Sequence, residues 1–409
     1  MTALAPLAPV RPMGSLGSGL FMRVLASSWH RGRLTVTLPD GSAHHLEGRE
    51  PGRTAVLAIS DWRCVRRTIA GGDIGFAEGY MAGEWDSPHL PTLLEAFADN
   101  YDRLSRLVDG NPALNALNRV AHGLNRNSRR GSRRNIHAHY DLGNAFYAGW
   151  LDASMTYSAA RFSAPDQSLE QAQRSKYARL AEIMDLRAGQ SVLEIGCGWG
   201  GFAEFAACEV GARVTAITIS REQHDYARRR IHEAGLNDRV DIRLVDYRDV
   251  EGRFDRVASI EMFEAVGEAY WPGYFATLRR VLKPDGRAGL QIITIRDDLF
   301  DGYRRRPDFI QKYVFPGGML PSEPRLGPVI AAAGLDWTLT ERFGADYATT
   351  LEHWGRRFEA AWDGIAASGR FDPRFRRLWR FYLAYCEAGF RSGRTDVIQI
   401  GLSAANGGD

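Results

Sequence analysis

Ser191-Val-Leu-Glu-Ile-Gly-Cys-Gly-Trp-Gly-Gly201 is the stretch of this chain that most directly indicates its fold. A short apolar run leads into a turn that contains Gly196, Gly198, Gly200 and Gly201, and a helix-like segment follows. Glycines suit such a turn because they adopt positive φ at little cost and let a ligand approach the backbone closely. A strand, a glycine turn and a helix in this order predict a nucleotide-binding βαβ unit. Glycines alone are a weak signal, because a turn that merely closes a βαβ unit also contains them.

The acidic residue two positions before the first glycine favours a cationic ligand. Glu194 suits an amine better than a pyrophosphate, and S-adenosylmethionine (SAM) carries an ammonium and a sulfonium but no phosphate. A nicotinamide-binding domain usually has an Asp or Glu about 20 residues after its glycines. The next predicted strand ends here in the neutral run Thr218-Ile219-Ser220, with Gln223 one turn into the following helix. These groups suit a ribose, and Asp246-Tyr247 after a further strand would supply an acceptor for the adenine amino group.

Length and composition indicate a globular protein of two domains. The chain has 409 residues, of which 44% are hydrophobic and 25% charged, and these values are ordinary for globular proteins. No run of about 18 apolar residues exists, so no membrane-spanning helix is expected. Residues 1–19, rich in Ala, Pro, Gly and Ser, predict a disordered start rather than a signal peptide. Four scattered cysteines without metal-ligand spacing indicate reduced thiols in a cytosolic protein and no metal site.

The net charge of +3 is distributed unevenly, in three clusters of arginines. They lie within residues 126–134, 304–306 and 374–380, and aromatic residues interleave with the third. Such runs are often solvated faces, but each basic residue near acidic lipid also contributes about 1 kcal/mol of attraction. No nucleic-acid-binding motif accompanies the arginines, so nucleic acid ranks lower as a partner. The sequence therefore favours peripheral binding to a membrane through Arg126–Arg134 and Arg374–Arg380.

Two regions with different strand patterns divide the chain. Residues 20–110 predict a small α+β domain, and the polar, basic residues 111–134 predict a linker. In residues 135–409 strands alternate with helices, which predicts a mostly parallel sheet covered on both faces. The expected strands are 33–37, 44–46 and 55–59 in the first region and 192–195, 213–217, 240–245, 255–260 and 288–295 in the second, and the expected N-terminal helices are 61–68 and 90–107.

Six further segments, in order along the chain, carry a family resemblance. They are His139-Tyr-Asp-Leu-Gly-Asn144, Met155-Thr-Tyr-Ser158, Met262-Phe-Glu264, Phe315-Pro-Gly-Gly318, Phe343-Gly-Ala-Asp-Tyr347, and Cys386 within Tyr-Cys-Glu-Ala-Gly-Phe. With the glycine turn, they resemble the cyclopropane-fatty-acyl-phospholipid synthases, the mycolic acid cyclopropane synthases and the fatty-acid C-methyltransferases. The resemblance runs from about residue 135 to the end, and more loosely through the N-terminal region.

The resemblance implies a Rossmann-like class I SAM-dependent methyltransferase domain behind a small N-terminal α+β domain. Tyr157 and Ser158 would meet the carboxylate end of SAM, and residues 192–200 would hold its methionine and ribose. Thr218 to Gln223 would hold the ribose, and Asp246 and Tyr247 the adenine. His139 and Cys386 are further candidate site residues on the same ground.

The resemblance also implies a bicarbonate site, and the chain departs from it at two positions. Family members of the bacterial cyclopropane type hold the ion with a Cys, a Glu, a His, a backbone group and a Tyr. In this chain Glu264 stands at the position of the Glu, Ile295 at that of the backbone group and Tyr347 at that of the Tyr. Ala159 stands where the Cys is expected, and Ile293 where the His is expected. The chain instead contains a second carboxylate, Glu261, and the amide of Gln291. Because two ligands of the ion are replaced, a bound bicarbonate is doubtful.

The chemistry of the family explains why this site matters. An alkene attacks the sulfonium methyl, which leaves a carbocation in a pocket that must exclude water; a nearby negative charge stabilises it and a base removes one proton. Loss of a proton from the new methyl closes a cyclopropane ring, whereas loss from a chain carbon gives a methyl-branched or methylene product. The residues predict Glu264 as the main catalytic carboxylate, Tyr347 as the group that orients it or any bound anion, and Glu261 as the next candidate.

Structural roles remain alternatives for several of these residues. Glu264 would also suit a helix start, and Tyr347 a core tyrosine with a satisfied hydroxyl. Cys386 lies in an aromatic, apolar segment and suits a small buried hydrophobe. His139 would serve equally as a structural histidine. The aromatic residues around Arg374–Arg380 fit the core-facing side of a helix.

The sequence thus predicts an enzyme that transfers a methyl(ene) group from SAM to the double bond of unsaturated phospholipid acyl chains, with a cyclopropane product favoured by the family. A methyl-branched or methylene product is the alternative, because the Cys and His are replaced. A methyltransferase for a soluble small molecule and a catalytically silent lipid-binding homologue are alternatives of other kinds. The expected location is cytoplasmic, at the inner face of the membrane, and a homodimer is left open.

Overall fold

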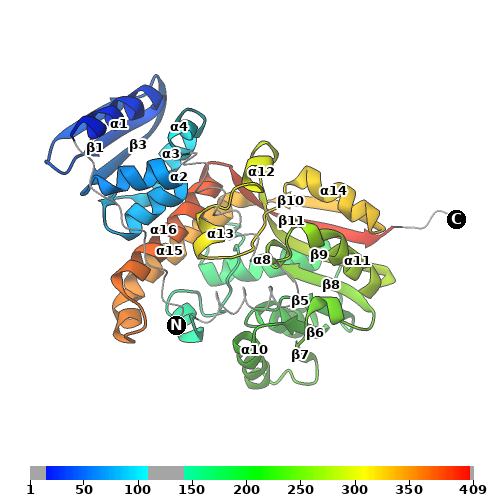
Figure 1. The fold of residues 1–409 in the computed structure, drawn as a ribbon. Coiled ribbons are helices and arrows are strands. Elements are labelled where there is room, and N and C mark those ends of the chain that lie inside the picture. The colour runs from blue at the N-terminus through cyan, green and yellow to red at the C-terminus, as the bar shows by residue number, and fades with distance from the viewer. Residues whose placement is uncertain (1–14, 109–141, 406–409) are drawn as a thin grey trace. The chain divides into compact units, whose positions relative to one another are not determined.

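The computed structural model describes residues 15–108 and 142–405 (Figure 1). Contacts group these residues into two compact units. The first contains residues 15–108, 302–314 and 354–394, and the second contains residues 142–301, 315–353 and 395–405. Two late segments are thus grouped with the N-terminal region, whereas the sequence predicted one continuous domain from residue 135 onward. The predicted linker 111–134 lies outside the described residues, and residues 15–19 of the predicted disordered start belong to helix α1 (Ser15–Ser28).

The second unit contains a seven-stranded sheet in the order β10-β11-β9-β8-β5-β6-β7. Its strands are β5 (Ser191–Ile195), β6 (Arg213–Thr218), β7 (Val240–Leu244), β8 (Phe254–Ile260), β9 (Leu282–Ile295), β10 (Leu335–Arg342) and β11 (Thr395–Ala404). The strands from β9 to β7 are parallel, which confirms the five predicted strands and the α/β class. β11 pairs antiparallel with β9, and β10 pairs antiparallel with β11 at the edge of the sheet; neither strand was predicted.

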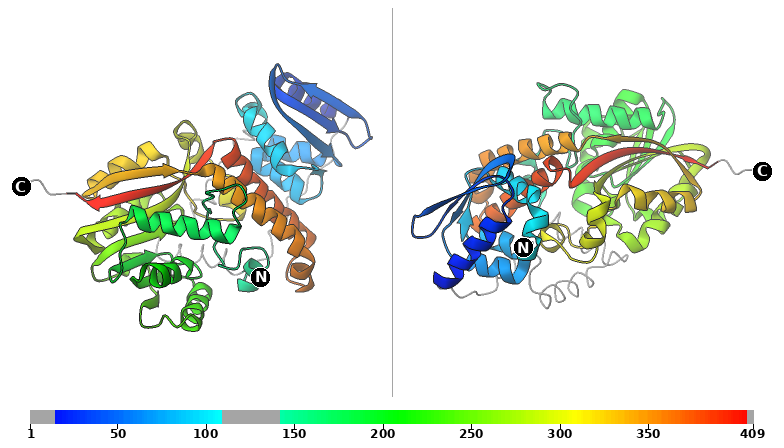
Figure 2. Two further views of the ribbon diagram at one scale, coloured as in Figure 1. Left: turned by 180° about the vertical axis from the view of Figure 1, so that it is seen from behind. Right: turned by 90° about the horizontal axis from the view of Figure 1, so that it is seen from above.

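Helices cover both faces of this sheet, as a doubly wound fold requires. α8 (Leu169–Ile183) packs against β9 and β11, and α11 (Trp271–Val281) packs against β9 and α14 (Glu323–Ala332). Figure 2 shows α8 on one face of the sheet and α11 with α14 on the other. The remaining helices of this unit are α7 (Asn144–Ala148), α9 (Gly201–Phe205), α10 (Arg221–Glu233), most of α12 (Asp297–Tyr303) and the start of α15 (Gly344–Ala367).

The order of the strands fixes where a ligand binds in this unit. β5 lies between β6 and β8, so the chain winds to one side of β5 and then to the other. In such sheets the crevice lies beyond the carboxyl ends of the strands at this switch. Glu194, Thr218 and Asp246 lie at or just after the ends of β5, β6 and β7, and Glu261 directly follows β8.

The first unit contains a four-stranded sheet in the order β2-β1-β3-β4. Its elements are β1 (Arg31–Thr37), β2 (Ala43–Glu47), β3 (Glu50–Ile59), α2 (Arg63–Met81), β4 (Trp85–Asp86), α3 (Leu90–Asp99), α4 (Tyr101–Val108), α13 (Phe309–Tyr313) and α16 (Pro373–Arg391). The three predicted strands are confirmed, and the predicted helix 61–68 is the start of the longer α2. The predicted helix 90–107 is two helices, because the Asn100 side chain binds the backbone of His30 and Arg31 and so interrupts it.

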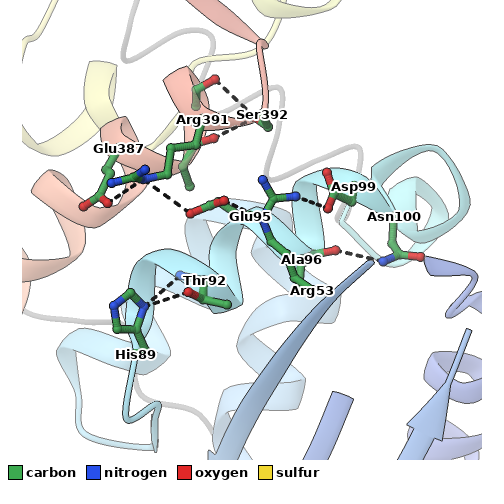
Figure 3. A network of polar contacts seen from close by, with 12 residues as sticks. Arg53, His89, Thr92, Glu95, Ala96, Asp99, Asn100, Glu387, Arg391 and Ser392 are labelled. Carbon is green, nitrogen blue, oxygen red and sulfur yellow. Dashed lines mark hydrogen bonds and ion pairs between the residues drawn. The ribbon is translucent and has the colours of Figure 1, made fainter. Parts of the chain in front are cut away.

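Polar contacts attach α16 to the N-terminal part of the first unit (Figure 3). Arg391 pairs with Glu387 at 2.8 Å and approaches Glu95 of α3 at 3.8 Å. Arg53 of β3 in turn binds both Glu95 and Asp99. These charges lie on α16, α3 and β3, which explains why residues 354–394 are grouped with the N-terminal elements.

The arginines of α16 are engaged within the protein. Arg377 donates to Asp86 at 2.9 Å and to the backbone carbonyl of Trp85 at 2.8 Å, while Arg376 and Arg380 pair with Glu359. The aromatic residues between them are buried, as expected for a core-facing side: Phe375, Trp379, Phe381 and Tyr382. These ion pairs reduce the positive charge that the helix offers to a membrane. Within the described ranges, no helix is both long and apolar enough to span a bilayer.

Candidate active site

The glycine turn after β5 has the backbone that the sequence predicts. Gly196, Gly198 and Gly200 have φ values of +83°, +51° and +86°, a backbone region that residues other than glycine rarely adopt. A Cβ added at Gly196 would lie 2.6 Å from the Cγ of Met262, so this position also needs the absence of a side chain. The backbone N–H groups of Gly196 and Cys197 both donate to the carbonyl of Ile217, which attaches the turn to β6.

Glu194 ends β5 as a buried carboxylate, only 3% exposed. Its Oε2 atom has no hydrogen-bond partner among the described residues. Burial raises the pKa of Glu194 to about 8, and the charges of Lys176 and Arg230 oppose this rise. A buried acceptor without a donor is costly, and an ammonium group would satisfy it. The residues therefore fit the amine-bearing end of SAM.

The predicted ribose-binding residues also cap helix α10. The Ser220 hydroxyl accepts the backbone N–H of Gln223, and the Thr218 hydroxyl donates to the Gln223 side chain at 2.8 Å. All three are buried, and Ile219 is partly exposed between them. Ser and Thr side chains are preferred at helix N-termini for this reason. The capping role does not remove the ribose role, which stays a prediction.

The predicted adenine-binding residues follow β7. Asp246 is buried and accepts two hydrogen bonds from the guanidinium of Arg248, at 2.8 and 2.6 Å. Burial raises the pKa of Tyr247 to about 12, and its ring packs edge-on against Tyr274. Arg248 is thus a partner of Asp246 that the sequence did not indicate.

Tyr157 and Ser158 lie in different surroundings. The Tyr157 ring packs among aromatic rings, including those of Tyr147 and Phe315. The Ser158 hydroxyl accepts a 2.6 Å hydrogen bond from Lys176, a lysine of α8 that is fully buried. Lys176 was missed at the sequence level.

The sequence does contain a signal for Lys176. It lies four residues after Ala172 and four before Leu180, at the spacing that places side chains on one face of a helix. Ala172 and Leu180 are fully buried, and so is Gln173 beside them. A lysine in phase with an apolar face therefore indicates a buried amine.

Glu261 is the most fully hydrogen-bonded carboxylate of the site. Its Oε1 atom accepts the backbone N–H of Ala159 at 2.8 Å and the side-chain amide of Gln291 at 2.7 Å. Its Oε2 atom accepts the hydroxyl of Tyr347 at 2.7 Å. Burial raises the pKa of Glu261, while the charge of Lys176 and these three hydrogen bonds oppose the rise.

The backbone of Glu261 is strained. Its φ of +48° lies in the left-handed region, which is uncommon for a residue with a side chain. The backbone N–H donates to the carbonyl of Gln291 at 2.9 Å and holds this conformation. Strain of about 1–3 kcal/mol at one residue is often found at functional sites.

Glu264 lies one 3-10 turn further on, in Phe263–Ala265. Its Oε1 atom accepts the backbone N–H of Ile293 at 2.6 Å, and its shielded Oε2 atom has no partner within the described part of the chain. Burial and the neighbouring charge of Glu261 raise the pKa of Glu264 to about 8. The raised pKa favours a protonated Glu264 near neutral pH, whereas the hydrogen bonds and the charge of Lys176 favour the ionised form of Glu261 against burial.

Strand β9 contacts the two carboxylates through residues that lie two positions before those implied by the family resemblance. The backbone N–H of Ile295 donates to the carbonyl of Pro321 at 2.9 Å. The backbone N–H of Ile293 donates to Glu264 at 2.6 Å, and the side-chain amide of Gln291 donates to Glu261 at 2.7 Å. A strand repeats every two residues, which is why a shift of two keeps the same face toward the site.

The residues present do not fit a bicarbonate ion. The donors that would hold an anion beside Ala159, Gln291 and Tyr347 already bind the carboxylate of Glu261. A second anion would lie against this negative charge, which is unfavourable at short range. Glu261 thus occupies the anion position with a group that belongs to the chain.

The other predicted site residues are grouped with the first unit or are not described. His139 lies outside the described residues. Cys386 is in α16 of the first unit, where burial and the charge of Asp308 raise its thiol pKa. All four cysteines are free thiols, and the described residues contain no cluster of three or more His, Cys, Asp or Glu side chains that would hold a metal ion.

The fold and site together define a class of enzyme. The parallel sheet with its glycine turn, the buried Glu194 and the neutral end of β6 are those of a class I SAM-dependent methyltransferase. The family description "Mycolic acid cyclopropane synthetase" matches residues 127–400. The chain belongs to this family.

Known proteins agree with this assignment. The chain is 38% identical over 403 residues to tuberculostearic acid methyltransferase UfaA1 of Mycobacterium tuberculosis, covering 96% of this chain and 92% of the relative. It is 35% identical over 388 residues to the cyclopropane-fatty-acyl-phospholipid synthase of Escherichia coli, covering 90% of this chain and 95% of the relative.

Solved structures agree as well. The mycolic acid cyclopropane synthase CmaA1, complexed with SAH and CTAB, matches with a TM-score of 0.62 at 28% identity, over 66% of this chain and 97% of that one. The cyclopropane synthase MmaA2 of Mycobacterium tuberculosis matches with the same values. The protein is therefore a SAM-dependent methyltransferase of the lipid-modifying kind.

Proposed function

We propose that this enzyme methylates the double bond of unsaturated phospholipid acyl chains, with Glu261 as the carboxylate that stabilises the carbocation and removes its proton. The observation that carries the proposal is the set of three hydrogen bonds to Glu261, from Ala159, Gln291 and Tyr347. They fix a negative charge in place before the reaction, and a prearranged charge is the most effective kind of electrostatic stabilisation.

SAM supplies the electrophilic methyl group. We assign its amine to Glu194, its ribose to Thr218, Ile219, Ser220 and Gln223, and its adenine to Asp246 and Tyr247. The π electrons of the alkene form a C–C bond to the methyl carbon while the S–methyl bond breaks and its electron pair stays on sulfur, so S-adenosylhomocysteine leaves and the other alkene carbon becomes cationic. Protons beside a carbocation are very acidic, so the position and charge of Glu261 matter more than its base strength.

The two carboxylates take different roles in this proposal. Three donors and the nearby charge of Lys176 favour the ionised form of Glu261 against burial, so we assign the negative charge to it. Glu264 has one donor and a raised pKa of about 8, so it enters the reaction protonated. This assignment replaces Glu264 as the main catalytic carboxylate, and Tyr347 orients Glu261 rather than Glu264.

We propose a methylene-branched chain as the product, rather than the ring that the family comparison favoured. Loss of a methyl proton directly from the first cation closes a ring. A hydride shift from the methylated carbon moves the cation to that carbon, and loss of a methyl proton then leaves an exomethylene group. A tethered carboxylate in place of a small ion changes the position of the base, and a relative that is 38% identical is named a tuberculostearic acid methyltransferase. A saturated methyl branch would need a separate reductase.

Proton NMR of the methylated lipid tests this proposal. The purified enzyme is incubated with methyl-labelled SAM and vesicles of monounsaturated phosphatidylglycerol, and the acyl chains are extracted. Exomethylene signals are expected, and high-field cyclopropane signals in their place would restore the ring assignment. Label that never enters the acyl chains, although SAM binds, would contradict the lipid proposal and favour a soluble substrate or a catalytically silent homologue.

Binding to the bilayer is proposed to be peripheral and electrostatic, at the cytoplasmic face. Because the arginines of α16 are ion-paired, we assign most of the attraction to the Arg126–Arg134 run. Raising the salt concentration to about 0.5 M shortens the Debye length to a few Å and should release the enzyme from anionic vesicles in a sedimentation assay. Replacing Arg129, Arg130, Arg133 and Arg134 with Gln should do the same at low salt. Binding that neither change weakens would indicate hydrophobic insertion instead.

A further inference from the structure

We propose that Lys176 is a positioning residue: its buried ammonium is the counter-charge that keeps Glu261 in the ionised, hydrogen-bonded form used in the reaction. The inference rests on the proposed function, because it assigns a role to Glu261 as the reacting carboxylate. In this proposal Lys176 acts on the reaction through another side chain.

The first argument is the burial of Lys176. Its side chain has no exposed surface and donates to the Ser158 hydroxyl at 2.6 Å, and its ammonium lies 4.4 Å from the centre of the Tyr177 ring. A lysine is almost never fully buried unless it is paired. A neutral side chain of similar length would pack on the same helix face without the cost of desolvating a charge.

The second argument is that two chains of contacts join Lys176 to Glu261. Ser158, which accepts from the ammonium, precedes Ala159, whose backbone N–H donates to Glu261 at 2.8 Å. On the other side, Gln399 donates to the backbone carbonyl of Lys176 and to the Oε1 of Gln291, whose amide donates to Glu261. Both paths place the helix of Lys176 against the anion position.

The third argument is the balance of charge around the pair. Glu261, Asp152 and Glu194 all act on Lys176 and favour its charged form, against burial, which lowers its pKa to about 7. The charge of Lys176 in turn favours the ionised form of Glu261. Tyr347 is a neutral hydrogen-bond donor to Glu261, and Glu264 is the nearby acid.

Two further charges lie at the edge of this group. Arg230 acts on Glu194, and Asp152 accepts the Ser154 hydroxyl. Neither contacts Glu261 through a hydrogen bond among the described residues. Lys176 is therefore the cation that sets the ionisation of Glu261.

The test compares Lys176→Met in the wild-type and Glu261→Gln backgrounds. Methionine keeps the length of the side chain and removes its charge, so the pKa of Glu261 should rise. At pH 7 we expect kcat to fall at least about tenfold, with the dissociation constant of SAM within about threefold of the wild-type value. Activity should recover as the pH is raised, because a higher pH ionises Glu261 without the help of Lys176. Glu264 is present in both the wild type and the Lys176→Met variant, so a difference between their pH profiles is caused by the change at residue 176.

In the Glu261→Gln background the same change should alter the residual kcat less than about twofold, since no carboxylate remains to be held. A loss of kcat that is equal in both backgrounds, or independent of pH, would overturn the proposal in favour of a packing role. A SAM dissociation constant raised tenfold with kcat retained would overturn it in favour of a direct contact with the SAM carboxylate.

Thermal unfolding makes the test independent of activity. Lys176→Met leaves an unpaired buried carboxylate, and Glu261→Gln leaves an unpaired buried ammonium. The double variant removes both charges and should unfold at a higher temperature than the Lys176→Met variant. An additive loss would contradict the pairing. If the wild-type enzyme methylates no lipid while this coupling is observed, the proposed function fails and the charge pairing stands.

Discussion

The ends of two neighbouring strands, β5 and β8, each bury a carboxylate, and the two differ in how they are satisfied. Glu261 after β8 accepts three hydrogen bonds, and both of its oxygens are occupied. Glu194 at the end of β5 has an oxygen without a donor within the described residues. The first site is complete within the chain, as expected for a charge that must stand ready for a reaction. The second is incomplete, as expected for a site whose partner is a ligand.

This comparison predicts opposite kinetic signatures for the two residues, and the largest effect belongs to Glu261. Glu261→Gln keeps the shape and removes the charge, so kcat should fall by at least about 100-fold, as losses of a general base do. The dissociation constant of SAM should stay within about threefold. Steady-state kinetics with monounsaturated vesicles and calorimetry with SAM measure the two quantities.

Glu261→Gly serves as the rescue experiment for that loss. Glycine relieves the positive φ of this residue and opens a space beside Ala159, Gln291 and Tyr347. Added formate or bicarbonate should then restore part of kcat, about tenfold, because the three donors are free to hold an anion. Activity that stays near normal in Glu261→Gln would show that the proton leaves by another route, with Glu264 as the next candidate.

A change at Glu194 should affect binding rather than turnover. Glu194→Gln removes the charge that we assign to the ammonium of SAM, and hydrogen bonds to charged groups contribute about 1.5–3 kcal/mol. The dissociation constant of SAM should therefore rise at least about tenfold, while kcat at saturating SAM changes little. Ser191→Ala, at the other end of the same strand, is the control. A lowered kcat with unchanged SAM binding would contradict this prediction, because it would place Glu194 in the reaction rather than in SAM binding.

The sequence predicted the SAM end of the site better than the acyl end, for a physical reason. The glycine turn and Thr218 lie within short stretches where strand, turn and helix signals coincide, so local patterns identify them. The surroundings of Glu261 combine residues that are far apart in sequence, namely Ala159, Gln291 and Tyr347. Only the fold shows that the side chain of Gln291 binds Glu261, while Ile293 binds Glu264 through its backbone N–H.

The antiparallel edge of the sheet was missed on similar grounds. β10 alternates between partly exposed and exposed residues over most of its length, so its hydrophobic pattern is weak. β11 supplies Gln399, which joins Gln291 to Lys176. A polar residue in a buried strand reduces the hydrophobic signal of that strand, although here it connects the site.

The smallest expected effect concerns Glu264, and it separates this residue from Glu261. Its pKa of about 8 means that it stays protonated in the folded protein up to that pH, whereas in the unfolded chain it ionises near its ordinary value. The folded state therefore binds more protons between about pH 5 and 8, and stability falls as the pH rises through this window. Glu264→Gln keeps the neutral form at every pH, so its melting temperature should fall less than that of the wild type over the same window. Glu194 has a similarly raised pKa, so part of the fall of stability with pH should remain in the variant.

Near pH 7 the Glu264→Gln variant should retain kcat within about tenfold, because glutamine resembles the protonated acid. A 100-fold loss at pH 7 would show instead that Glu264 is the charged base, and melting curves that remain parallel would show that it is already ionised in the folded protein.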